Sequence, residues 1–225
     1  MSPTGSYGHE PFSVTTEGLS KRFNHEWIFR DLSMAFYGGK KYAVTGPNGS
    51  GKSTLLQVLW GQMPQTSGDL QYRKGDKTIE SADVHRHVSI ATPYMDLIEE
   101  FTLREILAFH FRLKPIRAPY NVPDLAREMY LDHALDKPLS AFSSGMKQRV
   151  KLGLACFTEA DIYFLDEPGT NLDAQAFSWY RKQLDDLPAQ ALVFIASNNP
   201  DEYPASAEVI DITRFKPRSR QPLSP

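Results

Sequence analysis

The run from Gly46 to Thr54 has the residue types needed to hold a chain of phosphate groups. It reads Gly46-Pro47-Asn48-Gly49-Ser50-Gly51-Lys52-Ser53-Thr54 and matches the pattern G-x-x-x-x-G-K-[ST] without a gap. The glycines let the backbone form a concave nest whose amide N–H groups point at phosphate oxygens. Lys52 can reach the β- and γ-phosphates and Ser53 can ligate Mg²⁺, which a plain glycine-rich turn would not require. The run therefore predicts a nucleotide-phosphate site.

Two acidic residues follow an apolar run later in the chain. The segment Ile162-Tyr163-Phe164-Leu165 is continuously apolar and leads directly into Asp166 and Glu167. Such a run is typical of a buried parallel strand, whose carboxyl end lies at the edge of the sheet where ligands bind. Asp166 can hold Mg²⁺ through water, and Glu167 can polarise an attacking water. Alone, the pair would fit a solvated strand end equally well; beside a phosphate loop we interpret it as catalytic.

The elements that must position these residues alternate between strand and helix patterns. Lys41–Thr45 is predicted to be a strand before the phosphate loop and Leu55–Trp60 the start of a helix after it. Further strands are predicted at 88–92, 162–165, 191–196 and 209–212, and helices at 103–113, 124–131, 143–157 and after Asp173. This alternation predicts an α/β fold with a mostly parallel central sheet. Strands at 12–16, 28–37 and 70–72 are expected to form a small antiparallel layer.

Composition favours one domain with subdomains. The chain has 225 residues, of which 41% are hydrophobic, enough for a sizeable core. We expect a domain at 12–213, with a helical subdomain at about 94–140, between flexible tails at 1–11 and 214–225. The net charge of −2 gives no electrostatic footprint for nucleic acid. The single cysteine, Cys156, excludes an internal disulfide and fits a reducing cytosol.

A third motif, Phe142-Ser143-Ser144-Gly145-Met146-Lys147-Gln148-Arg149, precedes the Asp-Glu strand. With it, the chain resembles the ATP-binding-cassette (ABC) ATPases, whose signature segment usually reads Leu-Ser-Gly-Gly-Gln. The segment Asn171-Leu172-Asp173 resembles the D-loop of that family, and Phe23 falls where the family often places an aromatic that stacks on adenine. The resemblance covers roughly residues 12–213, and the order of its motifs is highly specific. A small kinase or a GTPase would share only the phosphate loop.

The resemblance implies a P-loop fold and Mg²⁺-dependent ATP hydrolysis by a head-to-tail dimer, with a homodimer expected. Each ATP would lie between residues 46–54 of one subunit and Ser143, Ser144, Gly145 and Met146 of the other. Glu167 would be the general base, Lys52 would stabilise charge, and Ser53 and Asp166 would hold the metal. The family function is to power a separate membrane-spanning permease, which implies a cytoplasmic protein at the inner face of the membrane. No apolar stretch approaches the roughly 18 residues that a membrane span needs.

Two positions depart from the family pattern. The family normally places a Gln after the strand that follows the antiparallel layer, but no Gln occurs between Gln71 and Gln148; Pro93 or Tyr94 takes its place. The usual switch histidine is replaced by Asn198, which can hydrogen-bond a phosphate oxygen but carries no charge near neutral pH. We therefore expect slow turnover without a histidine component from position 198 in the pH profile.

Alternatives remain open at this stage. The segment Pro93–Phe101 is either the groove that receives a helix of the permease or apolar surface that packs on the helical subdomain. The chain could also be an ATP-switched interaction module with slow or no turnover, which the two departures favour slightly. A DNA-maintenance ATPase of the same superfamily is disfavoured, because no heptad repeat lies between the phosphate loop and the signature.

Overall fold

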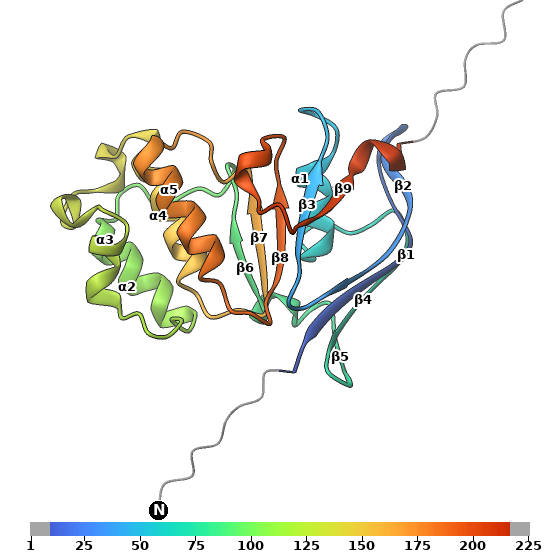
Figure 1. The fold of residues 1–225 in the computed structure, drawn as a ribbon, viewed down its shortest axis with the longest axis horizontal. Coiled ribbons are helices and arrows are strands. Elements are labelled where there is room, and N and C mark those ends of the chain that lie inside the picture. The colour runs from blue at the N-terminus through green and yellow to red at the C-terminus, as the bar shows by residue number, and fades with distance from the viewer. Residues whose placement is uncertain (1–9, 217–225) are drawn as a thin grey trace, which may run out of the picture.

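A computed structural model describes residues 10–216 and contains two sheets with helices around them (Figure 1). The central sheet has five strands in the order β6-β7-β8-β3-β9, and all neighbouring strands run parallel. Its strands are β3 (Lys41–Thr45), β6 (Val88–Ala91), β7 (Ile162–Asp166), β8 (Leu192–Ala196) and β9 (Glu208–Asp211). The predicted α/β fold with a parallel central sheet is confirmed.

The antiparallel layer forms a separate sheet in the order β2-β1-β4-β5. Its strands are β1 (Phe12–Phe23), β2 (Glu26–Tyr37), β4 (Ser67–Lys74) and β5 (Lys77–Ile79). β1 is longer than the predicted strand, because shifts in its register beyond Thr16 let it continue along β2 and β4. β5 was not predicted, since three residues after a tight turn carry no periodic signal.

The helices divide between the two faces of the central sheet. They are α1 (Lys52–Leu59), α2 (Leu103–Leu113), α3 (Leu125–Glu128), α4 (Ser144–Cys156) and α5 (Ala174–Asp185). Short 3-10 turns occur at Val84–Arg86, Val122–Asp124, Asp132–Ala134, Leu139–Ala141, Pro200–Glu202 and Ile212–Phe215. In Figure 1, α2, α3, α4 and α5 gather on one side of the central sheet and α1 lies on the other, toward the antiparallel sheet.

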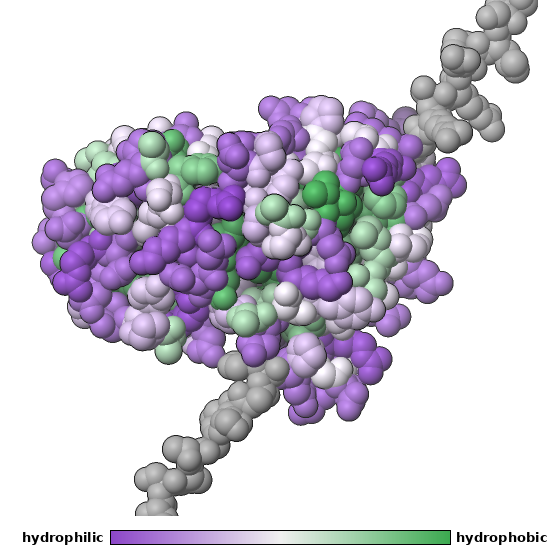
Figure 2. All heavy atoms as spheres, viewed as in Figure 1, coloured by the Kyte–Doolittle hydropathy of each residue, from purple (hydrophilic) through white to green (hydrophobic). Residues whose placement is uncertain are grey.

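The apolar residues of β7 contribute to two hydrophobic cores, one on each face of the central sheet. Ile162 and Phe164 join a core built with α1 and the antiparallel sheet, whereas Tyr163 and Leu165 join a second core built with α2, α4 and α5. Alternate side chains of a strand point to opposite faces, so a strand covered on both faces must be apolar throughout. Hydrophilic residues consequently dominate the face shown in Figure 2, and hydrophobic residues form only small patches there.

The helical subdomain begins at α2, a predicted helix that opens with a capping box. The Thr102 side chain accepts from the Glu105 backbone N–H, and the Glu105 carboxylate accepts from the Thr102 N–H at 2.8 Å. The predicted helix at 124–131 is wrong in length, since only α3 is helical and Tyr130 leaves it with φ at 56°. Among residues 10–216, no helix is long and apolar enough to cross a bilayer.

The predicted tails lie mostly outside the described residues. The structure begins at Glu10, and the predicted tail boundary at Arg214 falls within the last 3-10 turn. Cys156 is fully buried, as expected for a packing residue, and burial raises the pKa of its thiol to about 12.

Candidate functional site

The phosphate loop joins β3 to α1 and depends on glycine at two positions. Gly46 and Gly51 have φ of 140° and 107°, a backbone region that other residues rarely adopt. A Cβ atom at Gly46 would lie 2.8 Å from Ile212 and Ser50, and one at Gly51 would lie 2.3 Å from Ile28 Cγ2. The first turn of α1 has no side-chain cap, so its N–H groups stay available for an anion.

The Lys52 side chain folds back against the phosphate loop. Its side chain is buried, and Nζ donates to the carbonyl of Gly46 at 2.9 Å. A neutral carbonyl is a weaker partner for an ammonium than a charged phosphate oxygen. The Lys52 ammonium is therefore oriented within the loop and can exchange this carbonyl for a phosphate.

Asp166 ends β7, and Glu167 follows it at the same edge of the sheet. Asp166 is only 1% exposed, and burial raises the pKa of its carboxyl to about 6, with Ser53 and Lys52 opposing the shift. Within the described residues, its Oδ1 has no hydrogen-bond partner. A buried, unpartnered carboxylate oxygen beside a serine hydroxyl fits a hard cation such as Mg²⁺. Glu167 has φ of 46°, in the left-handed region that a non-glycine residue rarely adopts, so the chain leaves the strand at this residue.

The burial of Asp166 predicts a stabilising variant. Because its folded pKa of about 6 exceeds the ordinary 3.8, folding favours the protonated carboxyl and the charged form costs stability above pH 6. We expect Asp166→Asn to stabilise the chain by about 1–3 kcal/mol at pH 7.5 without Mg²⁺ or nucleotide. The gain should shrink as pH falls from 6 toward 4. Urea unfolding at pH 7.5 and pH 5 measures both; an equal gain at the two pH values would contradict the assignment.

Asn198 lies directly against the phosphate loop. It follows β8, which pairs with β3, so the ends of these strands meet at one edge. Its Oδ1 accepts from the Gly46 N–H at 3.2 Å, and its Nδ2 donates to Asn48 Oδ1 at 3.1 Å. The structure thus brings Asn198 to the loop through both ends of its amide.

The signature residues stand at the start of α4 and contact the D-loop. The Ser143 side chain caps the helix by accepting from the Met146 N–H at 3.2 Å. A Cβ atom on Gly145 would lie 2.7 Å from the carbonyl oxygen of Asn171, so only glycine fits. Gln148 Nε2 donates to the Pro168 carbonyl at 3.0 Å. α4 is thereby fixed to the segment that carries Glu167 and the D-loop residues Asn171, Leu172 and Asp173.

A family model described as "ABC transporter" matches residues 29–170. The chain belongs to the ABC transporter family. It is 29% identical over 90% of its length to the sulfate/thiosulfate import ATP-binding protein CysA of Nitrosomonas europaea. It is 32% identical over 72% of its length to the maltose/maltodextrin import ATP-binding protein MalK of Yersinia pestis. The chain spans 58% and 44% of these two relatives, about half of their length.

Solved structures of ABC proteins share the fold. An ABC transporter ATP-binding protein from Pyrococcus furiosus aligns with a TM-score of 0.76 at 20% identity, covering 91% of this chain and all of that one. A bacterial Atm1-family ABC exporter with ATP bound aligns with a TM-score of 0.74 at 18% identity, covering 89% of this chain and 37% of that one. These two likenesses bear on the fold alone.

Within this ABC domain, the predicted site residues do not all meet. The phosphate loop, Asp166 and Asn198 share one edge of the sheet, whereas no hydrogen bond in the described chain joins residues 143–146 to residues 46–54. Phe23 ends β1 and is 44% exposed, with Lys21 Nζ 5.0 Å from its ring centre. Its contact with adenine stays a prediction.

Sequence reasoning missed Glu202, which follows β8 in a 3-10 turn. It is 7% exposed, and burial raises the pKa of its carboxyl, with Glu167 adding to the shift. A Cβ atom on Gly169 would lie 2.5 Å from Glu202 Oε1, so the carboxylate supports the turn after Glu167. Its neighbours are polar and reveal no periodic pattern, so the sequence carries no signal that this glutamate is buried.

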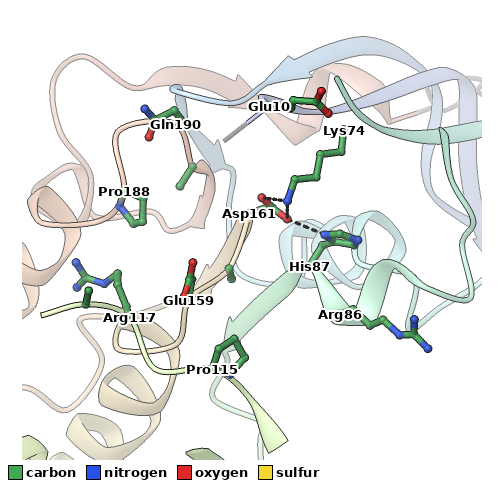
Figure 3. A pocket seen from close by; sticks show the side chains of 13 residues that line it. Glu10, Lys74, Arg86, His87, Pro115, Arg117, Glu159, Asp161, Pro188 and Gln190 are labelled. Atoms are coloured by element: carbon green, nitrogen blue, oxygen red, sulfur yellow. Dashed lines mark hydrogen bonds and ion pairs between the residues drawn. The ribbon is translucent and has the colours of Figure 1, made fainter. Parts of the chain in front are cut away.

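Two cavities lie away from the phosphate loop. One, of about 550 Å³, is lined by Trp60, Ile90, Tyr94 and Met95 among others. The other, of about 510 Å³, lies at the amino ends of the central strands. There Asp161 pairs with Lys74 at 2.9 Å and with His87 Nδ1 at 2.6 Å (Figure 3). The Asp161 carboxylate therefore has two partners, Lys74 and His87.

Proposed function

We propose that this chain binds and hydrolyses ATP and powers a transporter through a separate membrane-spanning permease. The observation that carries the proposal is the meeting of Lys52, Asp166 and Asn198 around one loop, in which Gly46 and Gly51 leave no room for a Cβ atom. The names of the relatives, which are import ATP-binding proteins, support the same function. We further propose a cytoplasmic location at the inner face of the membrane, reached through the permease.

The proposed mechanism assigns each residue one task. Lys52 and the loop N–H groups hold the β- and γ-phosphates, and Asn198 offers its amide to the γ-phosphate side of the loop. Glu167 accepts a proton from the water that attacks the γ-phosphorus, while the bond to the β-phosphate oxygen breaks and ADP leaves. Ser53 and Asp166 would hold Mg²⁺, which when bound neutralises charge on the β- and γ-phosphates.

The site is proposed to be completed by a second subunit. Ser143 and the first N–H groups of α4 form a helix start that can bind an anion. In Figure 1, α4 lies on the opposite side of the central sheet from α1, the helix that follows the phosphate loop. A second copy arranged head to tail would bring its Ser143–Met146 to this loop. ATP would then bind both subunits and stabilise the dimer by mass action.

The 550 Å³ cavity is the proposed docking groove for the permease. Tyr94 and Met95 line it, and Tyr94 is 76% exposed, which is unusual for so large an aromatic. Trp60 and Ile90 supply apolar surface from the ATP-binding part of the domain. A helix that inserts apolar side chains here would contact both the central sheet and the segment leading to α2.

The test of the proposal is ATP hydrolysis by the purified chain at several protein concentrations. A dimeric ATPase should show a specific rate that rises with concentration until dimerisation saturates. Absence of ATP binding would overturn the proposal. Tight ATP-dependent dimerisation without turnover would instead support the second candidate, an ATP-switched interaction module. Asn198 in place of histidine and the lack of Gln at Pro93 or Tyr94 are the observations that favour it.

The amide side chain at position 198 leads to a separate prediction about how turnover depends on pH. An amide does not titrate, so the wild-type rate should lack a component from position 198 between pH 5 and 8. In Asn198→His, the imidazole should add a transition near its ordinary pKa of about 6.5 and raise turnover above it. Steady-state rates from pH 5.5 to 8.5 measure both effects. If the variant kept both the wild-type rate and the wild-type profile, position 198 would have no catalytic role.

A further inference from the structure

The segment 93–101 is attached to α4 by two lysines of that helix. Lys151 Nζ donates to the carbonyl of Pro93 at 2.8 Å, and Lys147 Nζ pairs with the Glu99 carboxylate at 2.5 Å. The lysines are four residues apart, so they leave the same face of the helix. Together they hold the segment at Pro93 and at Glu99, on either side of Tyr94 and Met95, which line the proposed groove.

The backbone adds to this attachment. The Ser140 N–H donates to the Glu99 carbonyl at 2.9 Å, and the Leu139 N–H donates to the Phe101 carbonyl at 2.8 Å. Residues 139–141 form the 3-10 turn that leads into the signature residues. The segment thus contacts the side of α4, through the two lysines, and the turn that precedes the start of α4.

The same segment has no comparable connection to the phosphate loop. The Tyr94 side chain is 76% exposed, and Pro93 has no side-chain donor or acceptor. In the described part of the chain, no hydrogen bond joins residues 93–101 to residues 46–54. The contacts described above therefore join the segment to α4 and to the turn before it, and not to the phosphate loop.

We propose that Lys147 and Lys151 form a clamp that couples the segment 93–101 to the signature residues 143–146. The clamp takes the place of a nucleotide-sensing side chain in the segment. On its other faces α4 contacts the Asn171 carbonyl through Gly145 and the Pro168 carbonyl through Gln148. A displacement of the groove would move the signature residues together with the turn after Glu167. The coupling rests on the proposed function, because the signature residues act on ATP held by the partner subunit.

Coupling between two sites is reciprocal, so it is measurable without the permease. Hydrogen exchange of the backbone in residues 93–101 is compared with and without ATP and Mg²⁺, in a Glu167→Gln background that keeps ATP intact. In this parent we expect ATP to slow exchange of the segment about fivefold or more, the low end of typical coupling. The variant Lys147→Met/Lys151→Met keeps the apolar stems and removes both ammonium groups.

In Lys147→Met/Lys151→Met, the clampless variant, ATP should still protect residues 143–146. Addition of ATP should change the exchange rate of residues 93–101 by less than about twofold. Lys147→Arg/Lys151→Arg should restore the response, because arginine also donates. Arg104→Met is the matched control: it removes the Arg104–Asp136 ion pair of the same subdomain and should leave the response unchanged. Lys147→Met alone, at a partly exposed position, provides a milder variant with an expected intermediate response.

Two results would overturn the clamp. One is an ATP response of the segment that is equal in the parent and in the clampless variant. The other is a parent in which ATP protects residues 143–146 but leaves 93–101 unchanged. If ATP protects neither region in the parent and no dimer forms, the proposed ATP-bound dimer itself fails, and the clamp fails with it.

Discussion

Replacing Glu167 by Gln is expected to lower the rate of ATP hydrolysis by about 10²–10⁴-fold, the usual contribution of a positioned general base. Glutamine has nearly the same shape but cannot take a proton from water. The backbone of Glu167 is held by donation from its N–H to the Ala196 carbonyl at 2.8 Å, which the substitution leaves in place. ATP affinity should therefore change little, and the ATP-bound dimer should accumulate. Single-turnover hydrolysis and equilibrium ATP binding separate these effects.

Asp161→Asn is a matched control for the loss of this carboxylate. Asp161 lies just before β7, at the opposite end of the strand from Glu167, and pairs with Lys74 and His87. Its substitution should lower stability but leave turnover per folded molecule within about twofold, because it touches no group of the site. If Glu167→Gln retained more than about a tenth of the wild-type rate, Glu167 would not be the base.

The second large effect is expected for Gly51→Ala in the phosphate loop. The new Cβ would lie 2.3 Å from Ile28 Cγ2, and φ at this position is 107°. Ile28 is β-branched, so its Cγ2 cannot swing away without changing the stiff χ1 angle. Backbone strain of about 1–3 kcal/mol adds to this contact. We expect ATP affinity, measured by calorimetry, to fall about 10²-fold, corresponding to roughly 3 kcal/mol.

Gly49→Ala separates backbone strain from steric contact. Gly49 also has a positive φ, of 76°, but a Cβ atom there would meet nothing within 4 Å. The ATP affinity of Gly49→Ala should fall about tenfold, from backbone strain alone. Adding Ile28→Ala to Gly51→Ala should recover part of the loss by removing the contacting methyl. Equal losses in the two glycine variants would show that Ile28 plays no part in shaping the loop.

Much of this site could be predicted because its residues are adjacent in sequence. The phosphate loop needs closely spaced glycines and a lysine, Asp166 ends its strand and Glu167 follows directly, so each motif carries its own local structure. The capping box at Thr102 and the cap at Ser143 are likewise local hydrogen-bond patterns. The α/β fold followed from the alternation of these strands and helices.

What remained hidden depends on contacts between distant residues. Glu202 and Gly169, His87 and Asp161, and Lys151 and Pro93 meet only because strands β6, β7 and β8 are neighbours and α4 packs beside them. No local pattern marks such partners, since a lysine or glutamate has the same helix propensity whether it is solvated or paired.

The amino-acid sequence by itself thus determined the phosphate loop, the acidic strand end and the fold class, because short-range geometry and side-chain periodicity specify them. Only the tertiary structure decided which charged side chain contacts which distant segment, because strand order and helix packing set the distances between them.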